Sequence, residues 1–295
     1  MNNIKFEVYH DQFYQLVGSQ FHLDELFSEA VWAEGPAWNS QNQTLFFSDV
    51  KANKLYCWNA EKGIQTVRSP SYFSNGNAID LQGNLISCEH GRRGISRTDQ
   101  QGNLELLVDS LDGKRLNSPN DVIVKSDGTI WFTDPPYGIL SDQEGKKSPS
   151  EIIGCYVYRF DPKTQQLNIA TFNTMRPNGL AFSPDESKLF VADMSVVEFN
   201  TDGLHHLVVF DIEGNYLKNR RNVAEISPGI PDGFCIANNE VIFCSCETGL
   251  VVLSTDGTLL GRFILDKTTS NCTFGDDQKT LFITATNSVY RLTIQ

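Results

Sequence analysis

The sequence contains no apolar run long enough to cross a bilayer, and its first 20 residues carry no apolar core of the kind found in secretion signals. Basic residues are also scarce, because 24 Lys and Arg stand against 36 Asp and Glu and leave a formal net charge of −12. Nucleic acids and anionic membrane surfaces attract basic patches, so neither is an expected partner. We expect a cytoplasmic protein whose acidic excess serves solubility or favours a cation site.

Disulfide frameworks and common nucleophile motifs are absent as well. Seven cysteines are scattered within apolar stretches, as Cys57, Cys88, Cys155, Cys235, Cys244, Cys246 and Cys272. An odd, dispersed set indicates reduced core thiols. Cys244-Ser-Cys246 lacks the two-residue spacer of common zinc and redox pairs. No Gly-x-Ser-x-Gly elbow or phosphate-binding loop occurs, which argues against a serine hydrolase or a nucleotide enzyme.

The sequence does contain one unit repeated about six times: polar tip, strand, turn, strand, polar tip and strand. The units recur every 40–60 residues or so, roughly the spacing of propellers and repeat arrays. Within Ser118–Tyr137, Asp127-Gly128 separates two apolar runs and predicts a tight hairpin. With no helix-period segment and no linker, we predict one all-β domain over residues 1–295, a six-bladed β-propeller with four-stranded blades. The weaker alternative is two stacked β-sandwich domains.

The two ends of the chain are expected to meet in one blade. The last unit supplies too few strands before Gln295, so its outer strand should come from about residues 21–28. Such a strand would close the ring and leave no open sheet edge at the seam. Residues 1–20 form an N-terminal extension without a clear pattern. Residues 141–150 are expected to be a loop over the site face or a flexible surface segment.

Inner strands of a propeller run beside a central channel, so the residues that open them should point towards one place at one end. Here they are two carboxylates and three carboxamides: Glu34, Asn77, Asn120, Asn178 and Asp232. Hard divalent cations, calcium above all, prefer oxygen ligands of this mixed kind. Zinc would favour His or Cys, and at the expected inner tips only Cys272 is of that type.

Asn, Asp and Gly also form turns, and any one of these motifs alone is best interpreted as a turn. Their recurrence at matching positions favours a site, and Glu34 is the clearest member because Glu is not a turn former. The ends of the second strands should make an outer ring on the same face, namely Asp49, His90, Asp134, Asp193 and Cys246. His90 lies beside Arg92 and Arg93, and these side chains either contact a polar substrate or form an ordinary solvated surface.

Four ordered motifs resemble the gluconolactonase/regucalcin (senescence marker protein) family, from about Trp32 to the C-terminus. They are Glu34-Gly35-Pro36, Ser118-Pro119-Asn120-Asp121, Arg176-Pro177-Asn178-Gly179 and Pro231-Asp232-Gly233. The resemblance implies a six-bladed propeller with one divalent metal ion in its channel. We expect Ca²⁺, with Mg²⁺, Mn²⁺ or Zn²⁺ as alternatives. The resemblance also implies that Glu34, Asn178 and Asp232 are ligands, with Asn120 at the metal or against the substrate.

Two departures concern the substrate side of the site. Regucalcin-type members carry Arg where this chain has Ser118, and a glutamate region where it has Thr133–Tyr137. The Thr133–Gly138 and Cys88–Arg93 stretches are more similar to the bacterial gluconolactonase branch. The expected metal ligands are therefore retained, while the expected substrate contacts differ.

The resemblance implies a metal-dependent hydrolase that opens a sugar lactone by attack of water on its carbonyl. We expect Asp232, Asn120 and His90 to be catalytic, with Asp232 as the first choice of general base. The predicted substrate-binding residues are Asn120, Tyr137, Asp134, Arg92 and Asp193. The partner is then a small-molecule sugar lactone, and the protein is a monomer or small homo-oligomer. Phosphotriester or aryl-ester hydrolysis at the same metal, or a non-catalytic binding platform, are the alternatives.

Overall fold

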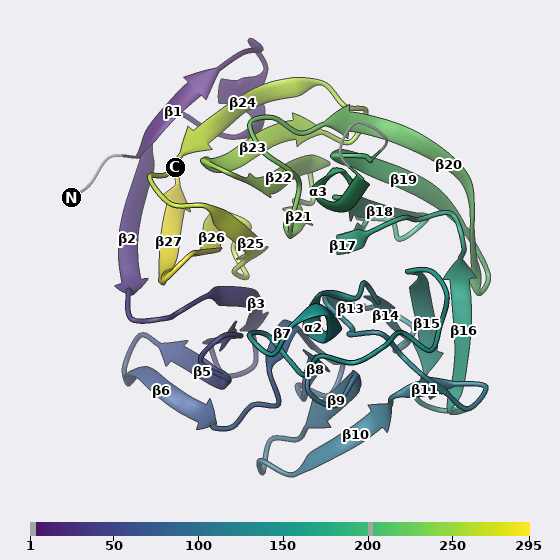
Figure 1. The fold of residues 1–295 in the computed structure, drawn as a ribbon. Helices are drawn as coiled ribbons and strands as arrows, with labels where there is room; N and C mark the ends of the chain where they lie inside the picture. Colours follow the sequence, from purple (N-terminus) through teal and green to yellow (C-terminus); the bar gives the residue numbers. More distant parts are fainter. Residues whose placement is uncertain (1–3, 200–202) are drawn as a thin grey trace.

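Six small sheets stand like blades around a central channel in the computed structural model, which describes residues 4–199 and 203–295 (Figure 1). Five blades have four antiparallel strands, and one has the same four with a fifth added at its edge; in the first four blades the strands follow one another in the sequence. The predicted six-bladed β-propeller with four-stranded blades is confirmed. The helices in the described ranges are short, and none could span a bilayer.

The first half of the chain builds three blades. Blade 1 contains β3 (Ala33–Asn39), β4 (Thr44–Asp49), β5 (Lys54–Asn59) and β6 (Gly63–Arg68). Blade 2 contains β7 (Ser74–Ile79), β8 (Leu85–Glu89), β9 (Gly94–Thr98) and β10 (Leu104–Val108), followed by a small ribbon of β11 (Ser110–Leu111) and β12 (Lys114–Arg115). Blade 3 contains β13 (Val122–Val124), β14 (Ile130–Thr133), β15 (Val157–Asp161) and β16 (Gln166–Thr171).

The second half builds the other three. Blade 4 contains β17 (Pro177–Phe182), β18 (Lys188–Asp193), β19 (His206–Glu213) and β20 (Tyr216–Glu225). Blade 5 contains β21 (Phe234–Ile236), β22 (Val241–Cys246), β23 (Gly249–Ser254) and β24 (Leu259–Ile264). Blade 6 contains β25 (Thr269–Phe274), β26 (Thr280–Ala285) and β27 (Ser288–Ile294).

The N-terminal segment completes the ring. Strand β2 (Phe21–Phe27) pairs with β27 as the outer strand of blade 6, as expected for the closing strand. Before it, β1 (Lys5–Val8) pairs with β24 and gives blade 5 a fifth strand, while α1 (Phe13–Leu16) places Phe13 in the core. The extension before residue 21 therefore covers the edge of blade 5, which would otherwise be an open template for strand pairing.

Polar turns connect the strands within the blades. Asp127 Oδ1 accepts hydrogen bonds from the Thr129 amide and hydroxyl at 2.9 and 2.6 Å, which produces the tight return from β13 to β14 that Asp-Gly predicts. Asp256 and the Thr258 amide form the same turn at 2.9 Å in blade 5. Because of these short connections, the second strand of each blade runs back to the channel end at which the first strand began.

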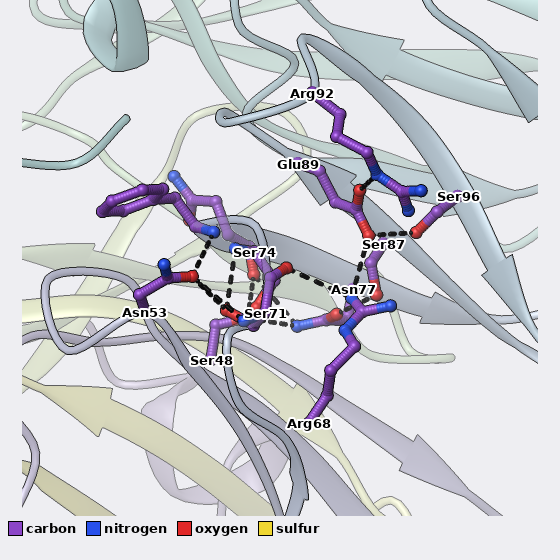
Figure 2. A network of polar contacts seen from close by, with 12 residues as sticks. Ser48, Asn53, Arg68, Ser71, Ser74, Asn77, Ser87, Glu89, Arg92 and Ser96 are labelled. Carbon is purple, nitrogen blue, oxygen red and sulfur yellow. Dashed lines mark hydrogen bonds and ion pairs between the residues drawn. The ribbon is translucent and has the colours of Figure 1, made fainter. Parts of the chain in front are cut away.

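Apolar clusters lie between neighbouring blades, and each of the five clusters in the described residues spans a boundary other than that between blades 1 and 2. That boundary is polar instead (Figure 2). Asn77 Nδ2 donates to Ser48 Oγ at 2.9 Å, and Asn77 Oδ1 accepts from Ser87 Oγ at 2.6 Å. Further out, buried Glu89 pairs with Arg68 at 2.9 Å. Because buried polar groups are costly unless bonded, this interface depends on hydrogen-bond geometry.

Candidate functional site at one end of the channel

The six inner strands begin at the same end of the channel, and each presents one polar side chain there. These tip residues are Glu34, Asn75, Asn120, Asn178, Asp232 and Asn271. Five of them are at most 7% exposed, whereas Asp232 is only half-buried. Hydrogen bonds across the blade boundaries, such as Gly76 N to Asn120 O at 2.8 Å and Ser270 Oγ to Ala33 O at 2.7 Å, tie the tips into a closed ring.

Two tips are not the residues expected from the sequence. In blade 2 the tip is Asn75, and Asn77 lies deeper, where its amide joins the blade 1–2 network. In blade 6 the tip is Asn271, and Cys272 follows it. The cause is a β-bulge, because the register shifts between Ser74 and Asn77 and between Thr269 and Asn271. A bulge changes which residue faces the axis, and strand alternation does not reveal it.

The glycines of the repeated motifs bring the tips close together. A Cβ at Gly35, which has a φ of +52°, would collide with the Asn75 carbonyl. A Cβ at Gly233 would collide with the Asn271 amide. Blade 3 carries Asp121 where these units have glycine, and its carboxylate extends into the channel, with Oδ2 3.4 Å from Asn271 Nδ2. The motif glycines are therefore a packing requirement of the ring, and Asp121 adds a third carboxylate beneath it.

These carboxylates repel one another in a dry environment. Burial, then Asp232, then Asp121 raise the pKa of Glu34 well above its usual value. Burial and the Asp121 carboxylate raise the pKa of Asp232 to about 8, and burial raises that of Asp121 to about 7. Uncompensated negative charge of this density is what a bound cation would neutralise.

The donor set fits a hard cation. Asn178 Nδ2 donates to Met194 Sδ at 2.8 Å and also bonds to Asp232, which leaves the Asn178 amide oxygen available. Within the described residues no three His, Cys, Asp or Glu side chains group as metal ligands. A cation here would therefore need amide oxygens as well as the Glu34 and Asp232 carboxylates, in the mixed set that calcium accepts.

Tyr137 opens the short helix α2 (Tyr137–Leu140), which follows β14 on the site face. Its hydroxyl is buried and has no hydrogen-bond partner within the part of the chain described. Burial and then the Asp232 charge raise the pKa of Tyr137, so it is a neutral donor at physiological pH. Tyr137 thus brings its hydroxyl group near Asp232, and its contact with substrate stays a prediction.

His90 lies against the ring with both nitrogens occupied. Its Nδ1 is 2.8 Å from the Glu144 carbonyl, and its Nε2 is 3.2 Å from Asn75 Nδ2. Because the Glu144 carbonyl can only accept, Nδ1 carries a proton, and Nε2 accepts from the Asn75 amide, so the imidazole is neutral. Burial lowers the pKa of His90 and therefore also favours the neutral form. The contact also places the 141–150 segment over the site face, where Glu144 pairs with Lys51 at 3.4 Å.

The carboxylates that end the second strands are already bonded to the backbone. Asp49 accepts from the Val31 and Trp32 amides at 2.9 and 3.0 Å, and Asp193 accepts from Met175 N at 3.0 Å. Asp134 accepts from Asn117 N at 2.8 Å, and its other oxygen is buried with no partner among the residues that the structure describes. They hold the segments that enter the inner strands, whereas a role of Asp134 or Asp193 in substrate binding stays a prediction.

Arg92 lies further from the axis. Its guanidinium pairs with Glu89 (Figure 2). It also stacks on Tyr72, 4.3 Å from the centroid of the aromatic ring. Substrate binding by Arg92 also stays a prediction. Among the residues that sequence reasoning missed, Asn75 had a visible signal, because Asn75-Gly76 repeats the pair Asn178-Gly179. Asn271 had none, since a cysteine follows it.

A β-propeller with a ring of carboxylates and amides at one channel mouth is therefore the class that fold and site define. Residues 32–287 match the family described as SMP-30/Gluconolactonase/LRE-like region, and the chain belongs to this family. It is 30% identical to the gluconolactonase of Zymomonas mobilis, with 92% of this chain and 80% of that protein covered.

Solved structures of related proteins have the same fold as this chain. A gluconolactonase from Xanthomonas campestris matches with a TM-score of 0.92 and 37% identity, and the match covers 100% of this chain and 96% of that one. A calcium-binding regucalcin from Agrobacterium tumefaciens matches with a TM-score of 0.74 and 16% identity, over 93% of this chain and 94% of that one. At that identity the second likeness is one of fold alone.

Proposed function

We propose that this chain is a divalent-metal-dependent lactonase that opens a sugar lactone, with calcium as the preferred ion. The observation that carries the proposal is the ring itself, in which the Asp232 charge raises the pKa of Glu34, and Asp232, whose own pKa is raised, is hydrogen-bonded to the Asn178 amide. Family membership and the relatives named gluconolactonase support the choice of substrate. The sugar-lactone partner and the catalytic role of the ring both follow from this proposal.

Glu34, Asn178 and Asp232 would hold the ion, with Asn120 as a further ligand or a substrate contact. Glu34 is fixed for this purpose, because its carboxylate accepts from Gly35 N at 3.1 Å and from the Trp32 indole. When bound, the ion supplies positive charge that polarises a carbonyl oxygen.

Proton transfer falls to Asp232, the most exposed carboxylate of the ring. It would take a proton from the water that attacks the lactone carbonyl, and return it to the ring oxygen that leaves as a hydroxyl. Tyr137 would donate its unused hydroxyl to a substrate oxygen beside Asp232. The same donor would fix the sugar ring relative to the attacking water.

His90 is better placed to hold the site than to move protons, because both of its nitrogens are occupied. It joins the Asn75 tip to the 141–150 segment through the Glu144 carbonyl. A catalytic proton transfer by His90 would require one of these contacts to open, and this remains the second role to test.

The test is acid release from glucono-δ-lactone by chelator-treated protein, with and without Ca²⁺, Mg²⁺, Mn²⁺ or Zn²⁺. We expect an added ion to restore hydrolysis in the wild type and not in Asp232→Ala. Asp256→Asn, in an exposed turn of blade 5, is the matched control and should behave as wild type. Hydrolysis that is unaffected by chelation would contradict metal dependence. Metal binding without hydrolysis would contradict the sugar lactone and direct attention to aryl esters and phosphotriesters.

A further inference from the structure

Two thiols from adjacent blades touch each other below the ring. Cys235 lies on β21 of blade 5 and Cys272 on β25 of blade 6, and their Sγ atoms are 3.4 Å apart. All seven cysteines are free thiols, and the inner strands of both blades border the channel (Figure 1). A disulfide bond is about 2.05 Å long, so the two sulfurs would have to approach by little more than an ångström.

Cys272 owes its position to the repeat. It directly follows the tip Asn271, at the place where four other units carry the packing glycine. Instead of leaving space, its side chain crosses the blade boundary, where Sγ lies 3.2 Å from the Phe243 carbonyl of blade 5. The contact with Cys235 thus arises because one unit departs from the glycine of the others.

A small oxidant can reach this pair. The channel contains a cavity of about 350 Å³ lined by residues of all six inner strands, and both cysteines belong to its wall. Cys235 is half-buried, whereas Cys244 and Cys246 are fully buried in the core between blades 4 and 5. Burial raises the pKa of Cys235, so this residue rests as a thiol and reacts slowly at neutral pH.

We propose that Cys235 and Cys272 are a modification site that forms a reversible disulfide when a peroxide enters the channel. The Cys235 thiolate attacks one oxygen of hydrogen peroxide and the O–O bond breaks, which gives a sulfenic acid and a hydroxide that takes up the proton released by the thiol and becomes water. The Cys272 sulfur then attacks the sulfenic sulfur, the S–O bond breaks, and a second water leaves. Two thiols have then lost two electrons and two protons, and the peroxide has been reduced to water.

The bond would reach the functional site through the backbone. Asp232 lies three residues before Cys235, and Asn271 lies directly before Cys272. Gly233 and Asn271 are already packed without spare room. Drawing the two sulfurs together would therefore displace the tips Asp232 and Asn271. Displacements of this size cost about a hundredfold in rate when they affect catalytic groups. Only this consequence rests on the proposed lactonase activity.

The test treats reduced, full-length protein with hydrogen peroxide and maps its cysteines by mass spectrometry under non-reducing conditions. We expect a Cys235–Cys272 linked peptide that dithiothreitol separates, and its absence in Cys235→Ser and in Cys272→Ala. Cys57→Ser, which alters a half-buried thiol on β5, should still form the link. Seven alkylatable thiols after peroxide, or a link between other cysteines, would overturn the proposal.

A second readout is kcat/KM for glucono-δ-lactone, expected to fall about ten- to a hundredfold on oxidation of wild type and Cys57→Ser and to stay constant in Cys235→Ser. If the protein hydrolyses no lactone, the peptide map still decides whether the bond forms. A linked protein with unchanged kcat/KM would contradict the coupling to the ring.

Discussion

The site face contains two rings of acidic residues that differ in what surrounds them. The inner ring, at the tips of the first strands, includes Glu34 and Asp232, whose main electrostatic neighbours are other carboxylates. In the outer ring, at the ends of the second strands, Asp49 and Asp193 each accept hydrogen bonds from backbone amides. Acidic side chains thus lie among other carboxylates in the inner ring and are bonded to backbone amides in the outer ring.

The difference shows that burial alone does not identify a functional carboxylate. Asp193 is 1% exposed, which makes it more buried than Glu34 at 7%. What separates them is the surrounding charge, because the Asp232 and Asp121 carboxylates act on Glu34, whereas each oxygen of Asp193 accepts from a backbone amide. Substitutions in the inner ring should therefore remove activity and leave folding intact. Substitutions in the outer ring should lower stability and leave activity intact.

The largest effect is expected for Asp232→Asn. It removes the proposed base, which is also a proposed metal ligand, so kcat/KM for glucono-δ-lactone should fall about a thousandfold, comparable with the loss of a major electrostatic group. The Tm of the metal-free protein should stay equal or rise, because a repulsive charge is gone. A Tm that falls together with the activity would show that Asp232 is a structural residue and would contradict the difference drawn between the inner and outer rings.

Asp134 should make stability depend on pH. Burial raises its pKa from 3.8 unfolded to about 7 folded, so the folded state holds a proton that the unfolded state has released between those values. The free energy of unfolding contributed by Asp134 is therefore full below about pH 4 and is lost as pH rises through 7, a change of about 2 kcal/mol between pH 5 and 7. Urea unfolding at several pH values should show a flatter profile for Asp134→Asn. Identical profiles would contradict the assignment.

Asp193→Asn should lower stability and spare the chemistry. The substitution weakens the bonds from Met175 N at 3.0 Å and Ser195 N at 3.1 Å, at a cost of about 1–2 kcal/mol. Chemical denaturation should show the loss, and kcat/KM per folded molecule should remain within about twofold of wild type. A large fall in kcat/KM at unchanged stability would instead support the predicted substrate contact of Asp193.

Tyr137→Phe should give the smallest effect. Its hydroxyl has no protein partner in the described residues, so its removal should not destabilise the fold. If the hydroxyl donates to substrate, kcat/KM should fall about fivefold to tenfold, the worth of one hydrogen bond. An unchanged kcat/KM would remove Tyr137 from the site, and a lower Tm would show a structural role instead.

The sequence by itself determined the repeat, the six blades, the closing strand at Phe21–Phe27 and most of the ring, including Glu34, Asn178 and Asp232. These features follow from short-range physics, since turn residues and apolar runs decide where strands begin and which ends share a face. The motif glycines could also be recognised in the sequence. The sequence does not show why glycine is needed there, which is that neighbouring inner strands approach one another closely.

Tertiary structure alone decided the rest. Bulges at the channel mouth turned Asn75 and Asn271 to the axis in place of Asn77 and Cys272. The alternation of residues along a strand does not reveal where a bulge will form. Contacts between blades placed Asp121 in the channel and Cys235 against Cys272. The same holds for the outer carboxylates, because whether an Asp is free or bonded depends on amides about 17 residues away that only the folded blade brings to it.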